Sequence, residues 1–165
     1  RGHDKDRAQL QQLLLKAYQH KGFSFVEIYT NCRIFNDGAF DLYTNGETRD
    51  DHTVWLEQGK PLVFGKKKDK GIKLDGFTPT VIDLTEGGFS INDVLVHNEA
   101  DSTLAFILAN MTYSETLPRP MGVLQNLERS SYEDRVVEQI QHEVESKGIG
   151  NLESLLLGGS YWEVK

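Results

Sequence analysis

The single cysteine of the chain, Cys32, ends a nearly continuous apolar run and is surrounded by polar residues. The run, "SFVEIYTNC", predicts a buried strand with the thiol at its carboxyl end. Asn31 precedes the cysteine, and Asn36 and Asp37 follow it shortly afterwards. In α/β proteins, ligands bind at the carboxyl ends of parallel strands. Two interpretations stay open: Cys32 is a small buried hydrophobe, as single cysteines mostly are, or it belongs to a ligand-binding edge.

Composition narrows the class of protein. Eighteen basic and 25 acidic residues give a net charge of −7. This sign argues against a nucleic-acid partner, because phosphate binding needs clustered Lys and Arg. No apolar stretch approaches the length of a membrane span, so we expect no membrane association. One cysteine cannot form an internal disulfide, and the expected compartment is therefore the cytoplasm.

The first part of the chain predicts a helix followed by a strand. Residues 6–20 have the apolar spacing of a helix with one buried face, and Gly22 supplies its stop. Apolar and polar residues alternate little over residues 23–29, which predicts a strand of a parallel sheet covered on both faces. We expect residues 1–45 to be the final helix–strand unit of a doubly wound α/β domain, and residues 46–165 to form an α+β extension.

The extension is predicted to contain short strands and capped helices. Gln58-Gly59 indicates a hairpin within residues 53–64, and Ser130 with Glu133 indicates a capping box. Further elements are expected at 72–84 (extended), 90–93 and 101–111 (helices), 117–128 (a loop and a short strand), 130–148 (a helix) and 152–158 (a short helix behind Asn151).

Motifs with a known chemistry are missing from the sequence. It contains no GxGxxG, no P-loop, no CxxC and no HExxH. The histidines lack the spacing of metal ligands, and no Gly-x-Ser-x-Gly elbow could activate a serine. We therefore assign no catalytic residue and expect the isolated chain to be inactive. Because the chain opens on Arg-Gly-His and on a helix that leads into a strand, we expect a fragment of a longer polypeptide.

The string around the cysteine, "HKGFSFVEIYTNCRIFNDGAF", resembles a segment of the β-subunit of 2-oxoacid:ferredoxin oxidoreductases. Its "NC-x-I-FND" version is most similar to the 2-oxoglutarate branch of that family. The strings "WLEQGKPLVFG", "DVLVHNE", "LPRPMGVLQ" and the closing "YWEV" resemble the C-terminal region of the same subunit, in the same order. The resemblance therefore covers essentially the whole chain.

The resemblance implies a thiamine diphosphate enzyme with Mg²⁺ that decarboxylates a 2-oxoacid, passes electrons through a [4Fe–4S] cluster to ferredoxin and releases an acyl-CoA. It implies that Cys32 is the fourth cluster cysteine. Asn31 and Asn36 are then candidates to order the cofactor shell around it, or they are simply turn residues. The other three cysteines and the thiamine fingerprint would precede residue 1. The implied partners are the N-terminal half of the β-subunit, the α-subunit and ferredoxin, with a 2-oxoacid and CoA as substrates. Residues 1–45 would then complete the thiamine-binding domain.

Two further features have open interpretations. Lys66, Lys67, Lys68 and Lys70 form a basic island in an acidic chain. This island is either a solvated loop tip or a docking site that attracts an acidic ferredoxin. Arg119, between two prolines, either reaches a carboxylate of substrate or CoA or is an ordinary exposed arginine.

A different class of function also fits the residues. The chain could be a non-catalytic α+β interaction or scaffold domain in which Cys32 is a buried structural thiol. Sequence preceding Arg1 would separate the two functions, since the resemblance requires a CxxC and a Gly-Asp-Gly there.

Overall fold

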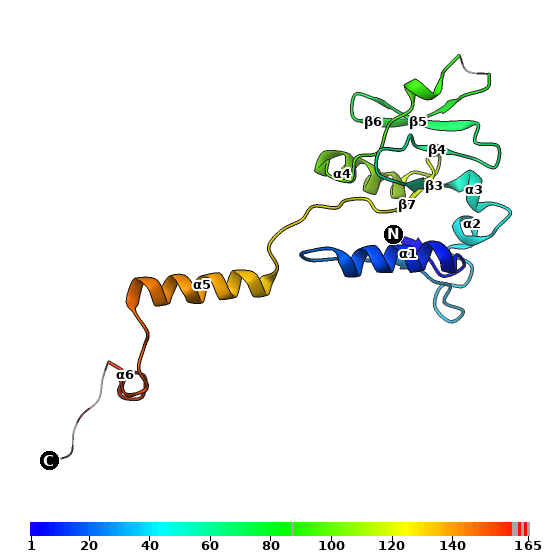
Figure 1. Cartoon of the computed structure of the whole chain (residues 1–165). Coiled ribbons are helices and arrows are strands. Elements are labelled where there is room, and N and C mark those ends of the chain that lie inside the picture. The colour runs from blue at the N-terminus through cyan, green and yellow to red at the C-terminus, as the bar shows by residue number, and fades with distance from the viewer. Residues whose placement is uncertain (87, 160–161, 163, 165) are drawn as a thin grey trace. The chain divides into compact units, whose positions relative to one another are not determined.

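The computed structural model describes residues 1–86, 88–159, 162 and 164. The chain divides into a larger unit, Arg1–His20 with Ser24–Leu127, and a smaller unit, Lys21–Phe23 with Glu128–Lys165. Helices and strands are mixed along it, which fits the predicted α/β class (Figure 1). In the part of the chain that the structure describes, no helix combines the length and apolarity needed to cross a membrane.

Helix α1 (Arg7–Gln19) confirms the predicted first helix. The Asp6 side chain accepts a hydrogen bond from the backbone N–H of Gln9 at 3.1 Å, which satisfies one of the free donors at the helix start. The chain turns away at His20, whose backbone is extended. Of the residues in α1, only Leu13 is fully buried, so the predicted apolar face is covered only in part.

The strand after α1 is shorter and more exposed than predicted. Strand β2 comprises only Ile28–Tyr29 and pairs in parallel with β1 (Gly2–His3). Phe25 is 80% exposed, and Tyr29 is the one buried residue of the strand. The prediction of a buried strand over 23–29 is therefore wrong for this chain. The physical reason is that a strand covered on both faces needs several neighbours, and among the described residues β1 is its sole strand partner.

The core of the larger unit lies between short sheets and one helix. Strand β3 (Thr53–Leu56) pairs in parallel with β7 (Arg119–Gly122). Strands β4 (Val63–Phe64), β5 (Lys70–Asp75) and β6 (Thr78–Asp83) form an antiparallel sheet. Helix α4 (Ser102–Asn110) begins behind Asp101, whose carboxylate accepts from two backbone N–H groups as its sequence predicts. The buried side chains that meet in this core are Val54, Leu56, Leu62, Phe64, Ile72, Ile82, Val94, Leu104, Leu108 and Met111.

The hairpin predicted around Gln58-Gly59 is wrong. The second arm does not pair with β3, because Leu62 donates its N–H to Leu95 O at 2.9 Å and accepts from Ile72 N. The hairpin of this region joins β5 and β6 instead and turns at Gly76, which has a left-handed φ of 60°. The short helical elements of the unit are α2 (Asp41–Thr44), α3 (Arg49–His52) and the 3₁₀ turns η1 (Ile91–Asp93) and η2 (Met111–Tyr113). The turn η1 lies where the sequence predicted a short helix.

The smaller unit contains two helices. Helix α5 (Tyr132–Lys147) confirms the predicted long helix, but its capping box is made by Ser131 and Asp134, one residue later than predicted. Helix α6 (Leu152–Leu157) begins behind Asn151, whose side chain accepts from Ser154 N at 2.7 Å, as predicted. No side chain of α5 is buried within the described residues. Two residues of the "YWEV" string, at positions 161 and 163, lie outside the described residues.

Candidate functional site

The loop that follows β2 is closed by the side chain of Asn31. Its amide nitrogen Nδ2 donates to Asp37 Oδ1 at 2.8 Å, and its Oδ1 accepts from Gly38 N at 2.9 Å. Cys32 and Asn36 form an isolated antiparallel bridge, in which Asn36 N donates to Cys32 O at 2.9 Å. The side chain of Asn31 can close the loop in this way because an amide both donates and accepts hydrogen bonds. The sequence therefore folds "NCRIFNDG" into a compact loop with Cys32 near its start.

Cys32 is exposed in this chain, where the sequence predicted a buried position. The interpretation as a buried hydrophobe does not fit this exposure. The backbone N–H groups of the loop lower the pKa of the Cys32 thiol, with Phe35 the largest cause, followed by Ile34. The thiolate is the form of cysteine that binds metals and attacks electrophiles. The loop is thus arranged to stabilise a thiolate.

The donor set fits one ligand of an iron–sulfur cluster and no more. A [4Fe–4S] cluster takes four thiolates, and the chain has a single cysteine. Across the described residues, no group of three or more His, Cys, Asp and Glu side chains could hold a metal ion. Hydrogen bonds from backbone N–H groups to sulfur are a feature that tunes such clusters. The other three ligands would have to come from outside this chain.

The side chains of Asn31 and Asn36 differ in how many of their hydrogen-bonding groups are already paired. The amide of Asn31 is occupied within the loop on both its oxygen and its nitrogen, so it acts on the loop's shape. The side chain of Asn36 is exposed and makes no hydrogen bond among the described residues, while its backbone N–H donates to the carbonyl oxygen of Cys32. Asn36 is therefore the freer of the two predicted cofactor-shell residues.

We expect the Asn31→Ala substitution to raise the pKa of the Cys32 thiol, because the loop would lose the bonds that hold its backbone N–H groups around the sulfur. Asn36→Ala is the matched control, since it removes a side-chain amide of the same size that makes no hydrogen bond within the loop. The pH dependence of thiol alkylation in the 165-residue chain measures the effect. The midpoint should move upward for Asn31→Ala and stay in place for Asn36→Ala. Equal midpoints in all three proteins would contradict the role given to Asn31.

Arg119 joins β7 to both ends of the cysteine loop, a role that neither sequence interpretation foresaw. Its guanidinium donates to the Tyr29 hydroxyl at 3.1 Å and to the Tyr43 hydroxyl at 2.9 Å. It also lies 4.2 Å from the centre of the Tyr43 ring, within cation–π distance. The Tyr29 ring stacks on Phe40 with 4.5 Å between ring centres. Arg119 thus positions the loop, and tyrosines at both ends of it were the signal in the sequence.

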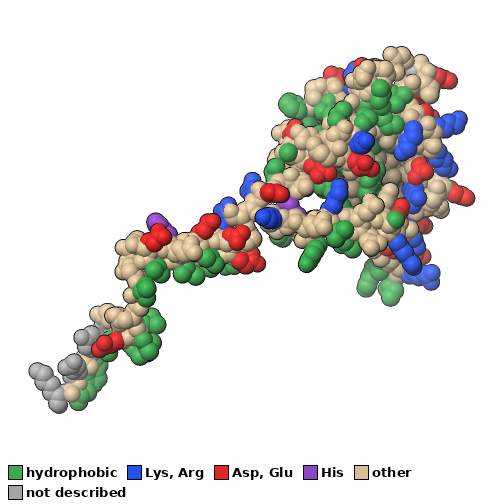
Figure 2. Space-filling view, viewed as in Figure 1, with side chains coloured by type: hydrophobic (Ala, Val, Ile, Leu, Met, Phe, Trp, Pro, Cys, Tyr) green, Lys and Arg blue, Asp and Glu red, His purple; other side chains and the backbone are tan. Residues whose placement is uncertain are grey.

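The basic island separates into two parts. Lys70 forms an ion pair with Asp51 at 3.2 Å, and this hydrogen bond lowers the pKa of the Asp51 carboxyl. Lys66, Lys67 and Lys68 are exposed. Basic side chains gather on one side of the larger unit in the view of Figure 2. The structure therefore leaves three of the four predicted lysines exposed at the surface, and Lys70 is engaged within the chain.

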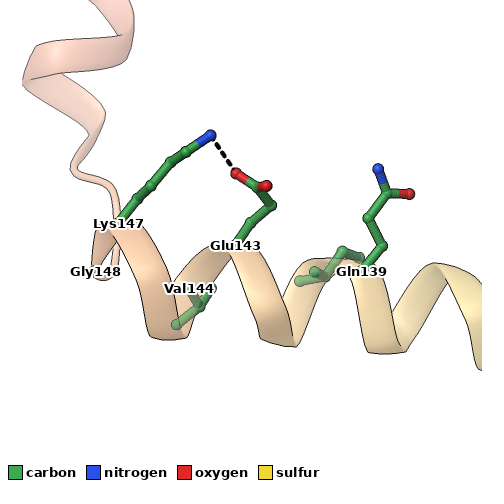
Figure 3. A pocket seen from close by; sticks show the side chains of 6 residues that line it. Gln139, Glu143, Val144, Lys147 and Gly148 are labelled. Atoms are coloured by element: carbon green, nitrogen blue, oxygen red, sulfur yellow. Dashed lines mark ion pairs between the residues drawn. The ribbon is translucent and has the colours of Figure 1, made fainter.

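An open groove of about 360 Å³ lies along the C-terminal part of α5 and contains none of the predicted site residues (Figure 3). Its walls come from one helix and the glycine that ends it, and Glu143 and Lys147 form an ion pair beside it. Since no second element supplies a facing group, the groove brings no reactive side chains together. The lining residues are Gln139, Ile140, Glu143, Val144, Lys147 and Gly148.

Comparison with known proteins supplies one informative match. No family model and no solved structure matches the chain. The chain is 30% identical over 165 residues to the 2-oxoglutarate oxidoreductase subunit KorB of Mycobacterium tuberculosis. The resemblance stated from the sequence is confirmed. The match takes in 98% of this chain and 43% of that subunit, so the chain spans less than half the length of this relative.

Proposed function

We propose that this chain is the C-terminal portion of the β-subunit of a 2-oxoglutarate:ferredoxin oxidoreductase. The observation that carries the proposal is the similarity to KorB, which runs through 98% of the chain and is not confined to one motif. The complete enzyme would oxidatively decarboxylate a 2-oxoacid to an acyl-CoA and pass the electrons to ferredoxin. Since the chain matches 43% of its relative, the remaining residues of the active site would come from other polypeptide.

The role of Cys32 is to provide one thiolate to a [4Fe–4S] cluster. Such a cluster, when bound, accepts and releases single electrons. The chain's own contribution is the thiolate and the backbone N–H groups of Phe35, Ile34 and Asn36, which stabilise negative charge on the sulfur. Asn31 keeps these groups in place, and Arg119 ties the loop to β7. Both residues act on the position of the sulfur and not on the substrate.

The cofactors thiamine diphosphate and Mg²⁺ would be held mainly by the N-terminal half of the β-subunit. In this arrangement residues 1–45 complete the thiamine-binding domain, with Asn31 and Asn36 at its edge, and residues 46–165 form an extension that packs against the α-subunit. Large apolar side chains near the loop are exposed in this chain, including Phe25, Ile34 and Phe35. Contiguous exposed apolar surface is typical of a surface that a partner covers.

An acidic ferredoxin would be attracted by the exposed lysines Lys66, Lys67 and Lys68 and, more weakly, by Lys70. Complementary charge raises association rates at low salt and loses its effect as ions screen it. Lys70 contributes less to this field, because Asp51 neutralises it at 3.2 Å. The proposed role is therefore a kinetic one, in steering the encounter.

The test is reconstitution of the complete complex with and without this chain. We expect 2-oxoglutarate- and CoA-dependent ferredoxin reduction in the complete complex and none when the chain is omitted, since a cluster ligand would be missing. The chain alone should neither reduce ferredoxin nor bind thiamine diphosphate in a calorimetric titration. Full activity without the chain would favour the alternative, a non-catalytic interaction or scaffold domain.

A further inference from the structure

A second polar site lies in the larger unit, in a cavity of about 110 Å³. Its walls come from the strands β1, β3, β4 and β7, from the helices α1 and α3, and from the loop between β4 and β5. The chemistry-bearing residues that line it are His3, Arg49, Asp50 and Lys68. One water molecule needs roughly 10–15 Å³ of such space, so the cavity can hold a group of several atoms.

His3 is the first reason to expect a ligand in this cavity. Its side chain is 5% exposed, and its Nδ1 atom is buried without a hydrogen-bond partner among the described residues. A buried polar atom without a partner is costly, and structures rarely keep one unless a further group supplies the bond. Burial, and then the charge of Arg49, lower the pKa of the His3 imidazole. The cavity is therefore lined by polar and charged groups, and one buried nitrogen of its wall lacks a hydrogen-bond partner among the described residues.

Two cations line the cavity against one carboxylate. The Arg49 atoms Nη1 and Nε lie 3.7 Å from Asp6 Oδ2 and 3.5 Å from Asp50 Oδ1. These distances are too long for strong hydrogen bonds, so the guanidinium keeps donors available. Lys68 has a left-handed φ of 56°, which is unusual for a residue with a side chain, and it forms no ion pair within the described residues. Its position is set by a turn in which its N–H donates to Gly65 O at 3.0 Å.

We propose that this cavity binds a small oxyanion, the phosphate or carboxylate group of a ligand, between Arg49, Lys68 and His3. Planar guanidinium donors and a lysine ammonium are the groups that recognise such oxygens in proteins. The buried imidazole nitrogen of His3 supplies the bond that completes the site. None of its residues belongs to the cysteine loop, and Lys68 is the one residue that it shares with the lysines proposed to steer ferredoxin. Binding of an anion to the chain alone therefore tests the cavity separately from the proposed function.

The site has a pH signature that a purely structural His3 would lack. A bound anion favours the charged imidazole and so raises the pKa of His3, which means that binding takes up a proton. Affinity should therefore increase as the pH falls toward the ordinary range of histidine. The other charged groups that face His3 are Arg49, Lys68, Asp50, Asp4 and Asp6. Sulfate is the suitable probe, because its own charge is constant between pH 5.5 and 8.

The experiment is an NMR titration of the 165-residue chain with sodium sulfate at constant ionic strength. Lys68→Asn should weaken sulfate binding about tenfold, the loss typical of one charged hydrogen bond, and asparagine tolerates the left-handed φ. Lys67→Asn is the matched control, because it removes the same charge from the same loop but does not line the cavity. Its affinity for sulfate should stay within about twofold of the unsubstituted chain, on the scale of a screened surface charge.

Three outcomes would overturn the proposal. These are equal weakening by both lysine substitutions, no shift of the His3 imidazole signals at saturation, and no binding of sulfate beyond that of chloride. Parallel titrations with inorganic phosphate and with acetate distinguish the two ligand chemistries, and tighter binding of either one supports the site. His3→Gln, which keeps a polar side chain of similar size, should retain the fold and lose the pH dependence of sulfate binding.

Discussion

Replacing Cys32 with alanine in the complete enzyme should remove one cluster ligand and lower the bound iron content. Ferredoxin reduction should fall by at least about a hundredfold, since changes even to the residues around metal ligands cost 10–100-fold. Thiamine diphosphate should still bind, because the substitution leaves the remainder of the cysteine loop and the rest of the enzyme unchanged. Iron analysis, calorimetry and ferredoxin-linked activity measure the three quantities separately.

The control for this substitution is Arg33→Ala, which changes the exposed neighbour of the cysteine. The backbone N–H groups that lower the pKa of the thiol belong to Phe35, Ile34 and Asn36, so this variant should keep its iron and its activity. A Cys32→Ala enzyme with full iron content and normal ferredoxin reduction would contradict the assignment of Cys32 as a ligand.

Gly122→Ala should destabilise the larger unit by about 3 kcal/mol, the range expected for backbone strain combined with a steric clash. Gly122 has a φ of 103°, a conformation that residues with a side chain rarely adopt. An added Cβ atom would lie 2.6 Å from the backbone oxygen of Leu56. Leu56 cannot move away easily, because it is 1% exposed in the core and is paired with Gly122 between β3 and β7.

Gly76→Ala separates the clash from the conformational strain. Gly76 also has a positive φ, of 60°, but a Cβ atom there would meet no atom within 4 Å. Its cost should be about 1 kcal/mol, the strain of one left-handed residue. Urea unfolding of the chain and of both variants gives the two free energies. A loss for Gly122→Ala no larger than that for Gly76→Ala would show that β3 and β7 can separate without cost.

Local signals in the sequence predicted the longer helices well, while the single-turn helices α2 and α3 were not predicted. Asp6, Asp101 and Asn151 each begin a helix with a side chain that accepts from the backbone N–H groups just after it. These interactions are complete within a few residues, so the sequence contains all the information about them. At α5 the adjacent residues Ser130 and Ser131 could both cap the helix. The choice between them depends on backbone geometry that cannot be read from the sequence alone.

Strand pairing could not be predicted in the same way. The pairing of β3 with β7 joins segments far apart in sequence, and Gln58-Gly59 resembles a hairpin turn although β3 and β4 do not pair. The apolar run before Cys32 has the composition of a buried strand, but burial depends on neighbours that cannot be read from the run itself. This is why Phe25 is exposed where the sequence predicted a core position.

The cysteine loop could be predicted in part. Asn31, Cys32 and Asn36 lie within six residues of one another, and their polar side chains after an apolar run were sufficient to select them. The contacts of Arg119 with Tyr29 and Tyr43 bring together three distant segments and were not foreseen. The cavity around His3 and Arg49 is of the same kind, since its lining residues come from six helices and strands and one loop.

The most direct test of the assignment of Cys32 is its reactivity in the complete enzyme. The complex is treated with an alkylating reagent before and after oxidative removal of the iron, and the Cys32 peptide is quantified by mass spectrometry. If Cys32 is a cluster ligand, it stays unmodified while iron is bound and becomes alkylated once the iron is removed from the assembled complex. Alkylation of Cys32 at the same rate with the iron fully bound would contradict the account.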